Sequence, residues 1–195
     1  MLTHFSYIQI PTSLTAETLL LANSRPKTLA HVQAVSEECA HLARRFGLNE
    51  ENCRIAGMLH DISAVIRPGD MLAWAETHHM PLCEAERRHP FLLHQRMSRL
   101  VAETAFGIAD ESILSAIECH TTLKSNASPC DMVLFIADKI AWDQPGEPPY
   151  LQAVTNALET SLAKACLAYM TDTEQSGKLL FPHTNWTEAV QWLHS

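Results

Sequence analysis

The apolar residues of this chain recur mostly at every third or fourth position, which is the spacing of an α-helix that buries one face. Residues 28–46 show this spacing most clearly, and Gly47 follows at the point where a helix would end. No segment shows the alternation of apolar and polar residues that a half-buried strand requires. The sequence therefore predicts an all-α protein, folded as a helical bundle.

Turn and capping residues divide the chain into its expected helices. Asn49 can cap a helix that runs toward Ile66, and Pro129 can open another. The predicted helices cover 28–46, 50–66, 70–78, 83–106 with a kink at Pro90, 111–120, 129–142, a long helix over 151–165, and 186–194. Residues 121–128 and 143–149 are predicted loops, and the chain from 171 is expected to be loop-like. No linker is long enough to divide the chain, so residues 1–195 are expected to form a single domain.

Composition and charge limit what the chain can bind. The formal net charge is −8, so long nucleic acid is not expected as a partner, because a phosphate backbone requires clustered Lys and Arg. A small phosphorylated substrate is compatible with this charge if a metal ion supplies local positive charge. No apolar run approaches the roughly 18 residues of a membrane helix and no signal peptide is recognisable, so we expect a cytoplasmic protein without a membrane partner. The six cysteines form no C-x-x-C pair and are expected to be reduced core residues.

Six polar residues interrupt the apolar stripes of five predicted helices. They are His31, His60, Asp61, His94, His120 and Asp138. His60 and Asp61 lie within the apolar segment IAGMLHDISAV (55–65), where an unpaired carboxylate would be strongly destabilising. Any one of these residues alone would be interpreted as a core residue with its own hydrogen-bond partner. Together they favour one shared partner, a divalent cation that binds imidazole nitrogen and carboxylate oxygen.

The ligand types indicate what kind of metal site this is. Imidazole and carboxylate without thiolate fit a catalytic Fe, Mn, Co, Ni or Zn site better than a closed structural zinc site. Four such ligands leave open positions on an octahedral ion. All six, with Asp61 bridging, can hold two ions about 3.5–4 Å apart, an arrangement that serves phosphoryl transfer. One ion and two ions are both compatible with the sequence.

The order H…HD…H…H…D resembles that of the HD-domain metal-dependent phosphohydrolases. The flanking segments LHDI and FIAD strengthen the resemblance. The chain is more closely similar to the YqeK branch, which hydrolyses diadenosine tetraphosphate symmetrically to two ADP. The segments that carry this similarity are HVQAVSEECAHLARRFGL, AGMLHDIS, HPFLLHQ, FGIADESILSAIECHTT and FIADKI. They imply an HD core over about 28–142, followed by C-terminal helices over about 150–195.

The resemblance also implies roles for individual residues. A first divalent ion would be held by His31, His60, Asp61 and Asp138. A second ion would be held by His94 and His120 and would share Asp61; with a single ion, these two histidines would contact phosphate or the attacking water. Asp61, His94 and His120 are the expected catalytic residues, and iron is the first candidate metal, with Mn, Co, Ni, Zn or Mg as alternatives. Arg67, Thr121 and Lys124 are expected to bind the substrate, a small nucleotide.

Several positions depart from the pattern expected for the YqeK branch. Gln95 stands where Gly is expected, the loop after His120 reads TTLKSN instead of TTGR, and KIAWDQPGEPP follows Asp138 where YIEPGR is more usual. These departures concern the expected rim of the substrate site. They leave open a nucleotidase or phosphodiesterase of the HD type that acts on another nucleotide, and a non-catalytic HD module that binds nucleotide or metal.

Two further residues near Asp138 have expected positions. Trp142 is expected to pack in the core rather than to stack on a base. Lys139 is expected to point about 100° away from Asp138, toward the mouth of the site or the surface. The sequence leaves the oligomeric state open, with a homodimer as one alternative.

Overall fold

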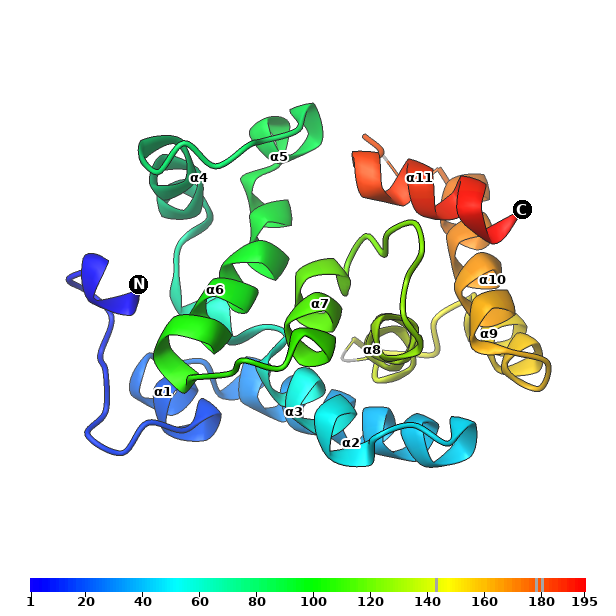
Figure 1. Ribbon diagram of the computed structural model, residues 1–195, viewed down its shortest axis with the longest axis horizontal. Helices are drawn as coiled ribbons and strands as arrows, with labels where there is room; N and C mark the ends of the chain where they lie inside the picture. Colours follow the sequence, from blue (N-terminus) through cyan, green and yellow to red (C-terminus); the bar gives the residue numbers. More distant parts are fainter. Residues whose placement is uncertain (143, 178, 180) are drawn as a thin grey trace.

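The computed structural model describes residues 1–142, 144–177, 179 and 181–195, and within these ranges it contains helices and no strand, which confirms the all-α prediction (Figure 1). The 3-10 helices are η1 (Leu2–His4), η2 (Ile62–Val65) and η3 (Pro90–Leu93). The α-helices are α1 (Ala16–Ala22), α2 (Pro26–Phe46), α3 (Glu50–Leu59), α4 (Pro68–Thr77), α5 (Glu84–Arg88), α6 (His94–Phe106), α7 (Glu111–Cys119), α8 (Pro129–Ile140), α9 (Leu151–Leu158), α10 (Leu162–Gln175) and α11 (Thr184–Leu193). None of the described helices has the length and apolar character needed to cross a membrane.

Several helix ends lie where the capping residues predicted them. Gly47 ends α2 with a φ of 68°, a left-handed conformation that glycine adopts without a steric penalty. The side chain of Asn49 accepts the backbone N–H of Asn52 at the start of α3. Pro129 occupies the first turn of α8, where its missing N–H removes no helical hydrogen bond. Of the predicted loop 143–149, Asp143 lies outside the described residues.

Two predicted helices are interrupted in the structure. The helix expected to run toward Ile66 ends at Leu59, and Asp61 has φ −109° and ψ 19° before η2 begins. A hydrogen bond to α6 replaces a helical one here, because the backbone N–H of Ser63 donates to the Ser98 hydroxyl at 3.2 Å, and the Ser63 hydroxyl also donates to the carbonyl of His94 at 2.9 Å. The element predicted over 83–106 consists of α5, η3 and α6. Pro90 lacks a backbone N–H and opens η3, so the change there is a break rather than a kink.

The C-terminal predictions also need correction. The single helix expected over 151–165 is two helices, α9 and α10, because Ser161 has an extended backbone and its side chain caps α10 by accepting the N–H of Lys164. Helix α10 then continues to Gln175, so the expectation of a loop from residue 171 is wrong for 171–175. Helix α1 was not predicted, although Thr15 and Thr18 form a capping box at its start.

Five helices carry the six polar residues or lead directly to them; α2, α3, α7 and α8 pack against one another, and α6, which begins with His94, packs on α7. Helix α2 contacts α3 and α8, and α7 also contacts both α3 and α8. Gly57 permits a close approach of α3 to α2, because a Cβ atom at this position would lie 2.7 Å from the Cα of Ser36. Figure 1 shows α9, α10 and α11 together at the other end of the molecule, where α10 packs on α8. This packing gathers the predicted ligands beside α8 and places α10 across from them.

Candidate metal centre and active site

Three histidines share one local geometry. His60, His94 and His120 each directly follow a helix, namely α3, η3 and α7. The Nδ1 atom of each lies 2.7, 2.7 and 2.8 Å, respectively, from the carbonyl oxygen three residues earlier, at Gly57, Phe91 and Ile117. A carbonyl oxygen can only accept, so each Nδ1 donates its proton. In the neutral ring the lone pair is then on Nε2.

These Nε2 atoms point toward a common space. The Nε2 atoms of His94 and His120 lie 2.9 Å apart. Two lone pairs cannot hydrogen-bond to each other, so this spacing calls for a cation or a proton shared between them. The Nε2 atom of His60 is buried and has no hydrogen-bond partner among the described residues. Buried polar atoms are rarely left without a partner, and a metal ion would supply one.

Two carboxylates complete the cluster. Asp138 Oδ1 lies 3.0 Å from His31 Nε2 and 3.6 Å from His60 Nε2. Asp61 places Oδ2 3.7 Å from His60 Nε2, while its Oδ1 lies 3.4 and 3.5 Å from His94 and His120. The two oxygens of Asp61 therefore face different histidines. At this site the described residues form two overlapping groups that could hold a metal ion, His31/His60/Asp138 and His60/Asp61/His120.

The donor set fits a divalent metal ion. Neighbouring ligands on an ion with bonds of about 2.1 Å are separated by roughly 3 Å. The 2.9 Å between His94 and His120 and the 3.0 Å between His31 and Asp138 agree with this value. Neither group includes a sulfur atom. The structure thus brings together all six residues that the sequence singled out, in a cluster able to bind metal.

The electrostatics of the cluster favour the protonation states that metal ligands need. Burial raises the pKa of the Asp61 carboxyl, but the facing histidines outweigh this effect and hold the pKa below its ordinary value. Burial likewise opposes ionisation of Asp138, yet Lys139 and His31 hold its pKa well below the usual range. Burial lowers the pKa of His120 to about 4 and also lowers that of His94. At neutral pH these two histidines are therefore neutral and the two carboxylates are charged.

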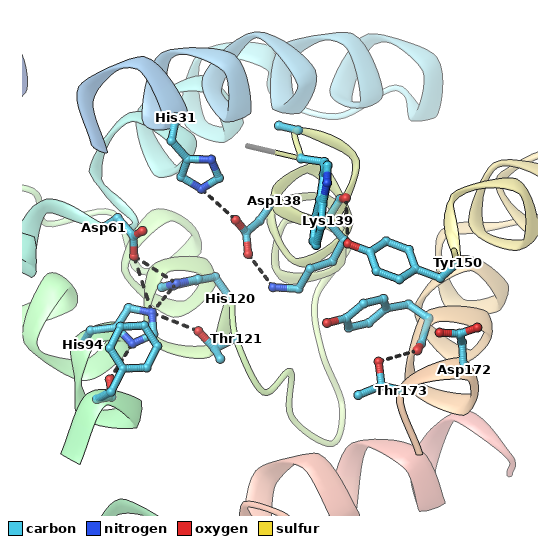
Figure 2. Close-up of a pocket in the computed structure, with 14 residues that line it drawn as sticks. His31, Asp61, His94, His120, Thr121, Asp138, Lys139, Tyr150, Asp172 and Thr173 are labelled. Carbon is cyan, nitrogen blue, oxygen red and sulfur yellow. Dashed lines mark hydrogen bonds and ion pairs between the residues drawn. The ribbon is translucent and has the colours of Figure 1, made fainter. Parts of the chain in front are cut away.

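The cluster opens into a cavity of about 460 Å³, a size suited to a small ligand. Figure 2 shows Asp61, His94, His120 and Thr121 on one side, Tyr150, Asp172 and Thr173 on the other, and Asp138 with Lys139 between them. Lys139 lies inside the cavity, where its ammonium group pairs with Asp138. It is the one Lys or Arg among the described residues that line the cavity.

The three residues expected to bind substrate have different positions. Thr121 lines the cavity, with its Oγ1 3.1 Å from His94 Nε2. Arg67 does not line it; its guanidinium lies over the ring of Tyr7, 4.2 Å from the centroid. Lys124 also lies outside, where it donates to the Ser115 hydroxyl at 2.6 Å. Of the three residues that the sequence predicted to bind substrate, Thr121 therefore lines the cavity, and Arg67 and Lys124 do not.

Gln95, which departs from the expected pattern, is fully buried behind the cavity. Its Oε1 accepts the backbone N–H of Thr121 at 3.2 Å, and its Nε2 donates to the Thr122 hydroxyl at 3.2 Å. This side chain therefore braces the loop that carries Thr121 and does not line the cavity.

Several lining residues were missed or misjudged from the sequence. Phe91, Tyr150 and Asp172 line the cavity, and no motif marked them. Both Tyr150 and Asp172 come from the C-terminal part of the chain. The packing of α10 on α8 brings Asp172 here, and Tyr150, which precedes α9, donates its hydroxyl to the Lys139 carbonyl at 3.2 Å. Trp142 does not pack in the core as expected: it lines the cavity with 38% of its surface exposed. Trp142 follows the end of α8 at Ile140, so it does not continue the face of that helix that packs in the core.

Comparison with known proteins gives several matches. The chain is 39% identical over 123 residues to the "Uncharacterized protein in pepC 5'region" of Lactococcus lactis subsp. cremoris, a match that spans 63% of each chain. It is 26% identical over 170 residues to the symmetrical bis(5'-nucleosyl)-tetraphosphatase of Bacillus subtilis, covering 85% of this chain and 88% of the relative. A protein of the same name from Halalkalibacterium halodurans is 26% identical over 143 residues, or 73% of this chain and 75% of the relative.

A solved structure is also similar over nearly the whole chain. It is the crystal structure of a predicted HD superfamily hydrolase involved in NAD metabolism from Clostridium acetobutylicum. The TM-score is 0.83 at 28% identity, with 92% of this chain and 95% of that chain covered. The HD domain model matches residues 28–143, the segment that contains all six clustered residues, and the chain therefore belongs to the HD domain family.

Proposed function

We propose that this protein is a metal-dependent phosphohydrolase of small nucleotides and that diadenosine tetraphosphate, cleaved symmetrically to two ADP, is its first candidate substrate. The observation that carries the proposal is the convergence of three Nε2 atoms and two carboxylates on one buried space. Relatives named symmetrical bis(5'-nucleosyl)-tetraphosphatase, whose matches cover most of this chain, support the choice of substrate.

The six clustered residues are proposed to hold one or two divalent ions. His31, His60, Asp61 and Asp138 are the proposed ligands of a first ion, and His94 and His120 are those of a second that shares Asp61. Iron is the first candidate, with Mn, Co, Ni, Zn or Mg as alternatives. When bound, such an ion polarises a phosphoryl oxygen and lowers the pKa of bound water toward neutrality.

The protein's own groups have proposed roles around the substrate. Lys139 lies in the cavity with its ammonium group beside Asp138, so it can place positive charge against a phosphate group. The Thr121 hydroxyl, beside His94, can donate a hydrogen bond to a phosphoryl oxygen. Asp61, His94 and His120 remain the proposed catalytic residues, because they lie where the cluster faces the cavity.

The proposed substrate fits the charge of the cavity only with metal present. A polyphosphate chain carries several negative charges, whereas the described lining contains one lysine and the carboxylates of Asp61, Asp138 and Asp172. The bound cations would therefore supply most of the positive charge that holds the phosphates and stabilises the transition state.

Product analysis tests this function. Purified protein is reconstituted with Fe, Mn, Co, Ni, Zn or Mg and given a panel of dinucleoside polyphosphates and mononucleotides, and the products are separated by chromatography. ADP alone from diadenosine tetraphosphate is the expected result. AMP plus ATP would show an off-centre cut, and turnover of mononucleotides alone would identify a different nucleotidase. No turnover of any compound with any metal would contradict the enzyme assignment.

A further inference from the structure

The cavity has an aromatic side chain at each of its two ends. Phe91 stacks on the ring of His94, with 4.5 Å between the centroids and 22° between the planes. Trp142 meets Tyr150 edge-on, with 6.2 Å between the centroids. Figure 2 shows His94 and Tyr150 on opposite sides of the cavity, with Asp138 and Lys139 between them. The groups that can contact phosphate therefore lie between two aromatic groups.

Both aromatic residues are unusually exposed for their size. Phe91 is 61% exposed and Trp142 is 38% exposed, and among the described large apolar side chains only Ile10 and Leu21 have comparable exposure. Neither ring contributes fully to the core, and both line the cavity. Nucleic-acid bases stack on exposed aromatic rings of this kind, whatever the base.

The Trp142 end also has a carboxylate, that of Asp172, which is close enough to Tyr150 to add to the effect of burial and raise the pKa of its hydroxyl further. Asp172 on α10 lines the cavity, and its side chain makes no hydrogen bond or ion pair within the described part of the chain. A carboxylate repels phosphate but accepts hydrogen bonds from hydroxyl groups. The 2′- and 3′-hydroxyls of a ribose are such donors. A nucleoside at this end would thus meet a ring for its base and an acceptor for its sugar.

We propose that the cavity has two nucleoside-binding ends, one formed by Phe91 and the other by Trp142 with Asp172. Each ring stacks one base, and Asp172 accepts a hydrogen bond from the ribose at the Trp142 end. This inference rests on the proposed function and narrows its substrate to ribonucleosides joined in pairs by a polyphosphate. A mononucleotide would leave one aromatic ring uncovered.

Kinetics of aromatic variants test the two ends. Phe91→Ala, Trp142→Ala and the double variant are assayed on diadenosine tetraphosphate and on p-nitrophenyl phosphate, which has no nucleoside. Loss of one stacked base lowers kcat/KM on the dinucleotide by about 5- to 150-fold. On p-nitrophenyl phosphate, which has no base to stack, each single variant is expected to lose less kcat/KM by this same factor. In the double variant the factors of the two single variants are expected to multiply. Equal losses on both substrates would overturn the proposal.

Trp74→Ala is the matched control. This tryptophan stacks on His78 at 4.0 Å between the centroids and does not line the cavity. Its removal is expected to leave the ratio of the two activities unchanged. A ratio shifted as far as that of Trp142→Ala would show a general loss of order and would contradict the proposal. A change in Trp142→Ala with none in Phe91→Ala would overturn the two-ended cavity and favour a mononucleotide.

Binding of adenosine tests Asp172 without any hydrolysis. Saturation-transfer NMR compares adenosine with 2′,3′-dideoxyadenosine on the unaltered protein and on Asp172→Ala. The unaltered protein is expected to bind adenosine more tightly, and the variant is expected to bind both alike. Unchanged selectivity in the variant would overturn the role of Asp172. Adenosine binding that depends on Trp142 and Asp172, without cleavage of any phosphoester, would instead refute the proposed function and leave the nucleoside-binding ends standing.

Discussion

Two largely buried clusters in the described part of the chain have similar residue types but opposite hydrogen-bonding geometry. In the candidate metal centre, His60, His94 and His120 donate from Nδ1 to carbonyl oxygens. In the second cluster, Cys83/Glu86/His183, the Nδ1 of His183 accepts the backbone N–H of Asn185 at 3.1 Å. The free lone pairs of the first cluster therefore lie on Nε2, whereas the Nε2 of His183 carries the proton.

The second cluster also supplies its own positive charge. His183 Nε2 lies 3.7 Å from Glu86 Oε1, and Arg96 donates to the same carboxylate at 3.0 Å. The contacts connect the start of α11 to α5 and α6. A set of His, Cys and acidic side chains within ligand distance is therefore insufficient evidence for a metal site. The Nε2 of His183, like that of His60, has no hydrogen bond among the described residues, but its proton faces the Glu86 carboxylate, whereas the Nε2 lone pairs of the first cluster face one another. The direction of each Nδ1 bond therefore distinguishes the two clusters.

The largest expected difference between the clusters is catalytic. Asp61→Ala should lower hydrolysis by 10²-fold or more and leave the helix content largely intact, because the lost carboxylate faces His60 with one oxygen and His94 and His120 with the other. Hydrolysis rates and circular dichroism measure both effects. Glu86→Gln, in the second cluster, serves as the control and should keep most of the activity. Near-normal turnover in Asp61→Ala would show that the His60-Asp61 pair has a structural role.

The next largest expected difference between the two clusters is their effect on bound metal. The purified, unchelated protein should contain at least about one equivalent of transition metal by elemental analysis. His60→Asn should lose most of it, because the variant lacks the Nε2 donor, while His183→Asn should retain it. If the unaltered protein binds none of the candidate metals, even after reconstitution, the first cluster is not a metal site and does not differ from the second in this respect.

Removal of Glu86 should affect stability instead. Glu86 is 2% exposed, and its loss removes the carboxylate that faces His183 and leaves Arg96 with the Pro81 carbonyl as its acceptor. Glu86→Ala should lower the free energy of unfolding by about 1–3 kcal/mol, measured with denaturant. Arg96→Met is the companion variant, and it should also destabilise the fold. A stability loss accompanied by loss of bound metal would contradict the assignment of this cluster as purely structural.

The smallest effect is a pH dependence. Burial raises the pKa of Glu86, but His183, the Cys83 backbone N–H and Arg96 outweigh it and lower the pKa to about 2. The ionised form is thus favoured in the folded state, so its stabilising contribution is complete above about pH 4.5 and disappears as the pH falls toward 2. One proton contributes a slope of at most about 1.4 kcal/mol per pH unit. The difference in unfolding free energy between the unaltered protein and Glu86→Gln should shrink across this interval; a constant difference would argue against the lowered pKa.

The sequence was informative where local rules decide the outcome. Gly47 and Asn49 set helix ends through their own backbone and side chains. The six polar residues were recognisable because a polar residue on an apolar stripe needs a partner wherever the helix lies. Ser161 divides 151–165 by capping, a local effect that the continuous apolar spacing obscured.

Residues positioned by tertiary packing were not predictable in this way. Arg67 lies over Tyr7 and Lys124 bonds Ser115, contacts that depend on how separate elements meet. Asp172 reaches the cavity because α10 packs on α8. The tautomers of the histidines also required the structure, because the carbonyl that accepts each Nδ1 proton is identified only once the side chain is placed.

The placement of two proposed ligands at helix ends has an electrostatic consequence. Helices α3 and α7 end immediately before His60 and His120, so the negative ends of both helix dipoles lie at the candidate metal centre. Together with Asp61 and Asp138 they create a negative field in the cavity before any ligand enters. This field attracts cations and repels polyphosphates. We therefore expect an ordered association, in which the metal binds first and the nucleotide follows.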